Sequence, residues 1–134
     1  MRHVSVSAGV LVVALVLGTT AAQAQSGFPY DRDLVFEVRP MRGSKRVPII
    51  AFSPDGRMQI DLWCKRGQGQ AAMVSGTLTI TIGEMADEPG CSPERAQADE
   101  EMLAALAGVT GLSLNGDVVT LTGAKPLRFR AATN

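Results

Sequence analysis

The sequence predicts an α+β fold that is mostly antiparallel β: a small curled or barrel-like sheet of about eight short strands with one amphipathic helix. Short apolar runs recur along the chain and are separated by turn residues, as at positions 54–57 and 115–116. At residues 77–82, apolar and threonine side chains alternate with the period of two that is typical of a strand buried on one face. A single helix signal lies within residues 92–108.

Residues 1–24 are typical of a secretory signal peptide. Arg2 supplies the positive start, an apolar stretch follows at residues 10–17, and residues 22–24 (Ala-Gln-Ala) give the small-x-small pattern at which such leaders are cleaved. A membrane anchor is the alternative, but the uninterrupted apolar run covers only residues 8–18, and a spanning helix needs roughly 18–20 apolar residues. We therefore expect cleavage after residue 24, a periplasmic or secreted mature chain, and no stable membrane anchor.

The first part of the mature chain predicts a lead-in and three strands. Residues 25–33 form a polar lead-in, and the domain itself is expected to cover residues 34–134. The Pro-Asp-Gly-Arg sequence at residues 54–57 has the chemistry of a tight turn, because proline fixes φ, aspartate bonds the backbone and glycine accepts a positive φ. Strands are expected at residues 34–38, 47–53 and 58–63, and the last two form a hairpin around that turn.

The middle of the chain predicts a second hairpin between two irregular segments. Residues 64–70 contain two glycines among polar residues and are predicted to be a loop or bulge. A phosphate cradle is the alternative for this Gly-x-Gly, but no helix and no lysine-serine pair follow it. Strands at residues 71–75 and 77–82 form the hairpin, and residues 84–91 are expected to be an irregular acidic connection.

The predicted helix begins and ends at recognisable signals. Ser92 suits the N-cap, Pro93 suits the first helical position, and Gly108 suits the end. We expect the apolar stripe to consist of Ala96, Met102, Leu103, Leu106 and Ala107. The side chains expected in solvent are Glu94, Gln97, Asp99, Glu100 and Glu101. Strands at residues 111–114, 117–122 and 127–130 complete the sheet, and the Asn-Gly pair at 115–116 predicts a type I′ hairpin turn.

Cys64 and Cys91 are the only cysteines, and an even number in an exported chain favours one disulfide. A redox or metal-binding pair is the alternative, but the two are not in a Cys-x-x-Cys arrangement. The adjacent Trp63 is the only tryptophan; we expect it to pack against the bridge, with contact to a ligand as the alternative.

Composition excludes several classes of function. The only histidine is His3 in the predicted leader, so the mature chain is expected to lack triads, general acid-base catalysis and zinc sites that need imidazole. The chain has 13 basic and 13 acidic residues, which is not the basic excess that nucleic-acid binding requires. The charges are nevertheless uneven: a basic cluster of Arg39, Arg42, Lys45 and Arg46 precedes a series of acidic residues at 84–101. These are either two solvated faces that partly neutralise each other or a surface for a partner.

The order of these features resembles the META domain family, which includes the heat-shock protein HslJ. The resemblance covers about residues 36–129 and rests on the combined order of several stretches, at residues 50–57, 63–65, 76–80, 85–91, 100–106 and 114–122. The chain departs from the family at residues 63–65, where Trp-Cys-Lys replaces the usual Gly-Cys-Asn. The resemblance implies a compact β-rich fold, an exported location, and an association with envelope stress and drug tolerance, but no catalytic residues.

We therefore expect a non-enzymatic exported domain with no catalytic, cofactor or metal site. Its partner would be an unknown protein or a small apolar ligand in the envelope, and the candidate partner surface is Arg39, Arg42, Lys45 and Arg46. An alternative is an inhibitor of an envelope-directed enzyme such as the basic protein lysozyme, which would meet the acidic residues at 84–88. An enzyme that uses two carboxylates is the remaining hypothesis.

Overall fold

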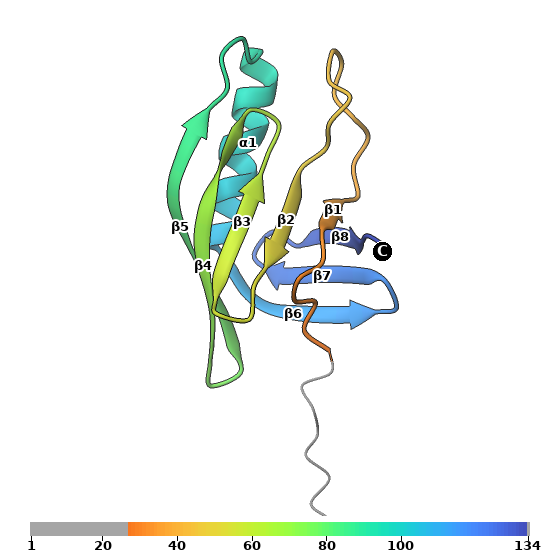
Figure 1. Cartoon of the computed structure of the whole chain (residues 1–134), viewed down its shortest axis with the longest axis vertical. Coiled ribbons are helices and arrows are strands. Elements are labelled where there is room, and N and C mark those ends of the chain that lie inside the picture. The colour runs from red at the N-terminus through yellow and green to blue at the C-terminus, as the bar shows by residue number, and fades with distance from the viewer. Residues whose placement is uncertain (1–26, 134) are drawn as a thin grey trace, which may run out of the picture.

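The computed structural model describes residues 27–133, which form one eight-stranded sheet and one helix (Figure 1). The strands are β1 (Leu34–Phe36), β2 (Ile49–Phe52), β3 (Arg57–Asp61), β4 (Lys65–Val74), β5 (Thr77–Asp87), β6 (Val109–Asn115), β7 (Val118–Gly123) and β8 (Leu127–Ala131). The helix α1 (Pro93–Ala107) connects β5 to β6. The predicted α+β fold, with antiparallel strands and a single helix, is confirmed.

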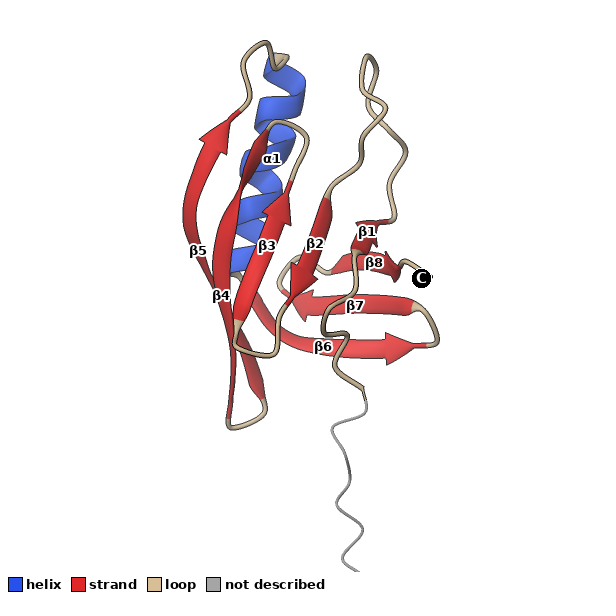
Figure 2. Ribbon diagram, viewed as in Figure 1, coloured by secondary structure: helices blue, strands red, loops and turns tan. Residues whose placement is uncertain are grey.

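The sheet is curled into a half-barrel. Its strand order is β5-β4-β3-β2-β1-β8-β7-β6, and every neighbouring pair is antiparallel. In Figure 2, β2 to β5 run along the long axis of the molecule, whereas β6 and β7 run across it. This bend brings the two end strands, β5 and β6, near each other, but no ladder joins them within the described residues.

One apolar core fills the curl. Phe52, Ile60 and Leu78 from one part of the sheet and Phe129 from the other are each at most 1% exposed. The helix adds Met102 and Leu106 to the same cluster. Burial of each such side chain contributes about 1.5–3 kcal/mol of transfer free energy, so the curl and the helix are stabilised by the same core.

The predicted hairpins form, but one of their turns is shifted by one residue. Gly56 has φ of 88° in the turn between β2 and β3, where residues with a side chain are strained. The second turn was predicted one residue too early: Asn115 is the last residue of β6 and pairs with Val118, so Gly116 and Asp117 connect β6 to β7. Gly116 has φ of 59° but Asp117 has no positive φ, so the turn is not the predicted type I′, which needs a positive φ at both central residues. Turn residues therefore located both hairpins, but they did not give the register of the second one.

The prediction of a loop or bulge at residues 64–70 was right in part, because the segment contains a bulge but is not a loop. Most of this segment belongs to β4, and β5 continues to Asp87 through the segment expected to be an irregular acidic connection. Glycine permits the pairing: a Cβ on Gly67 would lie 2.2 Å from the carbonyl oxygen of Glu84. The register shifts between Gly67 and Gly69, where one residue of β4 faces two of β5. The two strands thus form a long ribbon with a β-bulge.

The helix has the predicted caps, but one of its faces was assigned incorrectly. Ser92 is the N-cap, its Oγ accepts a hydrogen bond from the backbone N–H of Arg95 at 3.4 Å, and the helix ends before Gly108. Asp99, which we expected in solvent, is 0% exposed, whereas Ala107 is exposed. The buried side of the helix therefore contains a carboxylate, which the next section describes.

The predicted signal peptide at residues 1–24 lies outside the described residues. Between residues 27 and 133, α1 lacks the length and apolar character of a helix that crosses a membrane.

Candidate functional site

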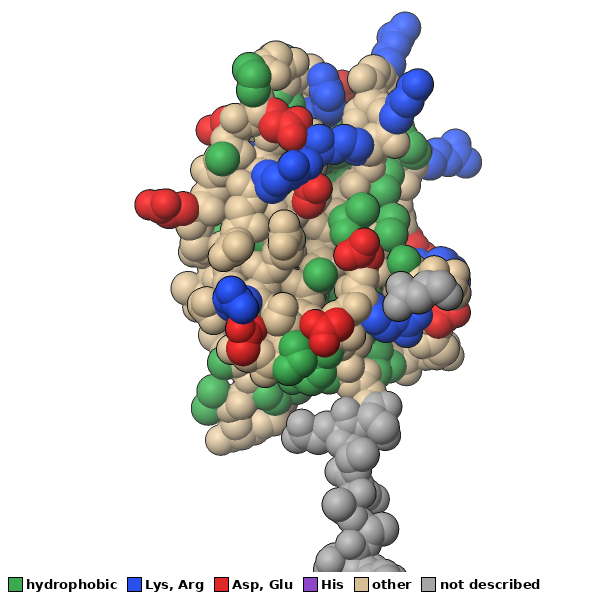
Figure 3. Space-filling model, viewed as in Figure 1, with side chains coloured by type: hydrophobic (Ala, Val, Ile, Leu, Met, Phe, Trp, Pro, Cys, Tyr) green, Lys and Arg blue, Asp and Glu red, His purple; other side chains and the backbone are tan. Residues whose placement is uncertain are grey.

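The four basic residues of the candidate partner surface all lie on the connection between β1 and β2, residues 37–48, which we call the basic loop. Arg39, Arg42 and Lys45 are exposed, and no ion pair or side-chain hydrogen bond involves them within residues 27–133. Figure 3 shows blue side chains projecting from the end of the molecule where this loop lies. Three cations are therefore free to meet a partner.

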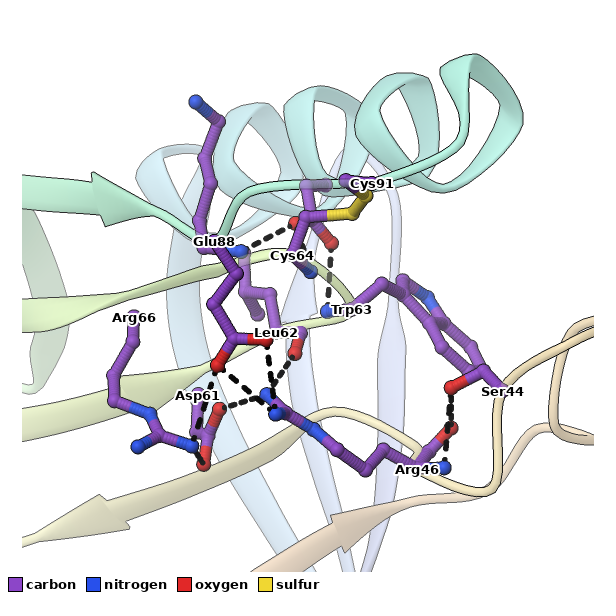
Figure 4. A network of polar contacts seen from close by, with 11 residues as sticks. Ser44, Arg46, Asp61, Leu62, Trp63, Cys64, Arg66, Glu88 and Cys91 are labelled. Carbon is purple, nitrogen blue, oxygen red and sulfur yellow. Dashed lines mark hydrogen bonds and ion pairs between the residues drawn. A yellow bond between two sulfur atoms is a disulfide. The ribbon is translucent and has the colours of Figure 1, made fainter.

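Arg46 has a different environment, because its guanidinium is occupied within the chain (Figure 4). One terminal nitrogen donates to the carboxylate of Glu88 at 3.0 Å and 3.2 Å. The other donates to Oδ1 of Asp61 at 2.8 Å and to the carbonyl oxygen of Leu62 at 3.2 Å. Hydrogen bonding to Glu88 raises the pKa of Arg46 above its ordinary value. Arg46 thus fixes the base of the basic loop to the sheet.

The ion pair between Arg46 and Glu88 shows that the basic loop and the acidic segment at residues 84–101 meet each other. Glu88 follows β5 and pairs with Arg46, and Arg66 lies 3.2 Å from Asp61 and 3.7 Å from Glu88. Two arginines and two carboxylates thus form one network in Figure 4. The charges of the acidic segment at this point are neutralised inside the chain.

We expect Arg46→Gln to loosen the basic loop at a modest cost in stability. The pairs are partly exposed, so the free energy of unfolding should fall by about 1 kcal/mol. Urea denaturation measures this loss, and amide hydrogen exchange should become faster at residues 41–46. Arg42→Gln is the matched control, because the side chain of Arg42 has no polar partner in the part of the chain that the structure describes, and its loss should change stability by less than about 0.5 kcal/mol. Equal exchange rates in both variants would contradict the anchoring role of Arg46.

A buried carboxylate organises the turn between β3 and β4, residues 62–64. Oδ1 of Asp99 accepts a hydrogen bond from the backbone N–H of Trp63 at 2.9 Å. Its Oδ2 accepts from the N–H groups of Cys64 at 2.7 Å and Lys65 at 2.8 Å. Sequence reasoning missed this residue, although a signal was present: Asp99 precedes Met102 and Leu106 by three and seven residues, which places it on the apolar face of the helix.

The same turn carries the disulfide. Cys64 is bonded to Cys91, which lies just before the N-cap of α1, and their Cα atoms are 5.7 Å apart. The carbonyl oxygen of Cys64 also accepts a hydrogen bond from the N–H of Glu88 at 2.8 Å. Trp63 is buried, with 4% of its surface exposed. The turn, the end of β5 and the start of α1 are therefore held together by covalent and polar contacts.

The acidic residues proposed to meet a basic enzyme are largely paired within the chain. Asp87 accepts a hydrogen bond from Nζ of Lys65 at 2.7 Å, and Glu88 binds Arg46. Hydrogen bonding to Asp87 raises the pKa of Lys65 above its ordinary value, so the ammonium of Lys65 keeps its charge to a higher pH. Of the carboxylates at residues 84–88, only that of Glu84 has no ion pair among the described residues.

Two carboxylates line one cavity, and the environment of one of them, Glu37, does not suit a general acid. Glu37 and Asp117 both border a cavity of about 400 Å³. Burial acts to raise the pKa of Glu37, but hydrogen bonds and charges from Arg128 and Arg130 outweigh it and the pKa is lowered. A general acid at neutral pH needs the opposite shift. In the described part of the chain there is also no group of three acidic, cysteine or histidine side chains placed to hold a metal ion.

Comparisons with known proteins identify a family and a similar fold. The family model described as "META domain" matches residues 34–134. A solved structure described only as "NMR structure of the protein" is similar, with a TM-score of 0.55 and 20% identity, and the match covers 76% of this chain and 89% of that one. A crystal structure of a DUF4847 family protein from Bacteroides vulgatus ATCC 8482 matches 62% of this chain and 57% of its own, with 16% identity and a TM-score of 0.47. A search of curated proteins finds no match. The structural likeness concerns the fold alone.

Proposed function

The chain belongs to the META domain family, and from this premise we propose that it is an exported, non-enzymatic binding domain whose basic loop contacts an anionic partner protein. The observation that carries the proposal is the contrast among the four basic residues of the loop. Arg46 is used to fix the loop to Asp61 and Glu88, whereas Arg39, Arg42 and Lys45 are exposed. A fixed loop that presents three cations suits recognition of an acidic surface.

The energetic argument concerns preorganisation and charge. A loop held at its base loses less conformational entropy on binding than a free loop does. Exposed charges mainly accelerate association and select a complementary partner, and their effect weakens with salt. The chain as a whole has no basic excess, so the attraction would be local to this loop.

Three observations support an exported, non-enzymatic role. Residues 1–24 have the pattern of a cleaved leader, and the disulfide between Cys64 and Cys91 suits an oxidising compartment such as the periplasm. The two carboxylates that share a cavity, Glu37 and Asp117, are each in ion pairs with arginine. Such groups are typical of structural ion pairs rather than of a proton-transfer site.

Neutralising the three free cations should weaken partner binding by about tenfold, since each exposed pair contributes about 0.5 kcal/mol. The test compares the disulfide-intact mature chain with the variant Arg39→Gln/Arg42→Gln/Lys45→Gln in capture from an envelope extract at low salt. The control Arg32→Gln/Arg57→Gln/Arg95→Gln removes the same charge from residues that neither belong to the basic loop nor pair with a residue of it, and it should retain the partner. Proteins held by the wild type and the control but lost from the loop variant would support the proposal. Equal capture by all three chains would refute it.

A further inference from the structure

Two neighbouring cavities lie at the end of the molecule away from the basic loop. The first, which we call the aromatic cavity, has a volume of about 260 Å³ and is bordered by Phe28, Tyr30, Phe52, Asp55 and Met73 among others. The second has a volume of about 290 Å³ and shares Phe28, Tyr30 and Met73, and Leu112 also borders it. The three shared side chains make the two cavities parts of one surface.

The segment around Tyr30 builds the aromatic wall. It is fixed to the end of β2 by a bridge between Tyr30 and Phe52 and by a hydrogen bond from the N–H of Asp31 to the carbonyl oxygen of Phe52 at 2.8 Å. The ring of Phe28 lies 4.4 Å from that of Tyr30 and 5.2 Å from that of Phe52, centroid to centroid. Three rings from two segments are thus held together at the cavity.

This end of the molecule also exposes unusual apolar area. Five large apolar residues are exposed among those the structure describes, and four of them lie here: Tyr30 (39% exposed), Met73 (56%), Val74 (61%) and Leu114 (41%). Leu114 lies close to the others. Gly27 lines the second cavity, and a Cβ added to Gly27 would be 3.3 Å from the side chain of Leu114. Figure 3 shows green side chains gathered at this end. A grouped apolar surface of this kind marks a binding site more often than scattered apolar residues do.

The residues that border the two cavities carry charge of one sign, although Arg57 lies beside them and pairs with the carboxylate. The aromatic cavity contains one carboxylate, Asp55, and neither cavity is bordered by a lysine or an arginine. Asp55 accepts hydrogen bonds from the backbone N–H of Arg57 at 3.0 Å and from its Nε at 2.7 Å. Aromatic faces and a carboxylate both attract a cation. The attraction to the aromatic faces is strongest for a cation that is weakly hydrated.

We propose that the aromatic cavity binds an organic cation with an apolar body. The cationic group would lie against the aromatic faces near Asp55, and the apolar body would extend past Met73 toward Leu112. An anionic ligand is disfavoured by the carboxylate, and a neutral ligand gains nothing from it. This site is separate from the basic loop, so it does not depend on the proposed partner of that loop.

Arg57 provides a sharp test because it competes with the ligand. Its guanidinium already pairs with Asp55, and both side chains are at least half exposed. Arg57→Gln should therefore release the carboxylate and strengthen binding of a cation about threefold, whereas Asp55→Asn should weaken it about fivefold. A purely apolar cavity would respond to neither substitution.

The experiment titrates the mature chain, labelled with 13C in its methionine methyl groups, with benzyltrimethylammonium at up to millimolar concentration. We expect the Met73 signal to shift and the Met41 signal, on the basic loop at the other end of the molecule, to stay in place (Figure 1). The matched probes are 3-phenylpropionate, which is anionic, and benzyl alcohol, which is neutral; both should bind at least about fivefold more weakly.

Several results would overturn the proposal. These are an unmoved Met73 signal, equal affinity for the neutral or anionic probe, or an affinity for the cation that is the same in Asp55→Asn and Arg57→Gln. Tyr30→Ala should reduce binding further by removing one aromatic face. The thermal midpoint of each variant shows whether it is folded. If Asp55→Asn disturbs the turn between β2 and β3, Arg57→Gln still tests the proposal, because this variant is expected to bind the cation more tightly.

Discussion

Replacing Asp99 by alanine should reduce the free energy of unfolding by about 3–5 kcal/mol. The carboxylate is fully buried and accepts three backbone hydrogen bonds, from Trp63, Cys64 and Lys65. Alanine leaves these donors without a partner inside the protein, and each buried unsatisfied donor costs about 1–3 kcal/mol. The loss is large because the turn between β3 and β4 has no other acceptor of this kind within the described residues.

Urea denaturation of the mature, disulfide-intact chain measures this effect. Asp99→Asn keeps one side-chain oxygen as an acceptor, so this variant should lose less stability than Asp99→Ala. It should still be less stable than the wild type, because its amide group places a donor beside backbone donors. Glu100→Ala is the control on the same helix; its carboxylate is exposed and 3.4 Å from Nζ of Lys65, so its loss should cost less than about 1 kcal/mol. If Asp99→Ala were no more damaging than Glu100→Ala, the buried carboxylate would not organise the turn.

The hairpins could be predicted from sequence because their information is local. The turn residues at 54–57 and 115–116 located two hairpins, and the structure has both, although Gly116 and Asp117 rather than Asn115 and Gly116 form the second turn. The helix caps at Ser92 and Gly108 are local in the same sense. The curl of the sheet could be predicted because the sequence contains about eight short strands, each of which has to bury one face.

The errors occurred where a distant partner decides the conformation. Gly67 and Gly69 have low strand propensity, yet they belong to β4 because the backbone of β5 approaches too closely for any side chain. Asp99 is polar and was placed in solvent, but the three amides that it binds come from residues more than 30 positions earlier. Neither contact is visible in a local window of sequence.

The candidate sites divide in the same way. The basic character of residues 39–46 could be read directly, but the pairing of Arg46 with Glu88 joins residues 42 positions apart, and only the fold reveals which cation is occupied. The aromatic cavity was missed entirely, because residues 25–33 were interpreted as a lead-in. Phe28 and Tyr30 acquire their role only when the segment lies across Phe52.

Removing the disulfide should be the second large loss. The bridge closes a sequence separation of 27 residues, and the chain-entropy model gives a stabilisation of about 3–4 kcal/mol for a loop of this length. We expect the Cys64→Ser/Cys91→Ser variant and the reduced wild type to show a similar fall in the free energy of unfolding by urea denaturation. Oxidised wild type is the reference, and an unchanged midpoint after complete reduction would contradict a stabilising role for the bridge.

The two large losses should not be additive, because both act on Cys64. Its side chain is bonded to Cys91, and its backbone N–H donates to Asp99. The bridge holds the turn against the start of α1, which is the helix that carries Asp99, so each contact keeps the partners of the other in place. Opening the bridge should therefore weaken the hydrogen bonds to Asp99, and Asp99→Ala should cost less in the serine variant than in the oxidised wild type. A double-mutant cycle should give a coupling free energy of about 0.5–3 kcal/mol. A value near zero would mean that the bridge and the carboxylate stabilise the turn independently.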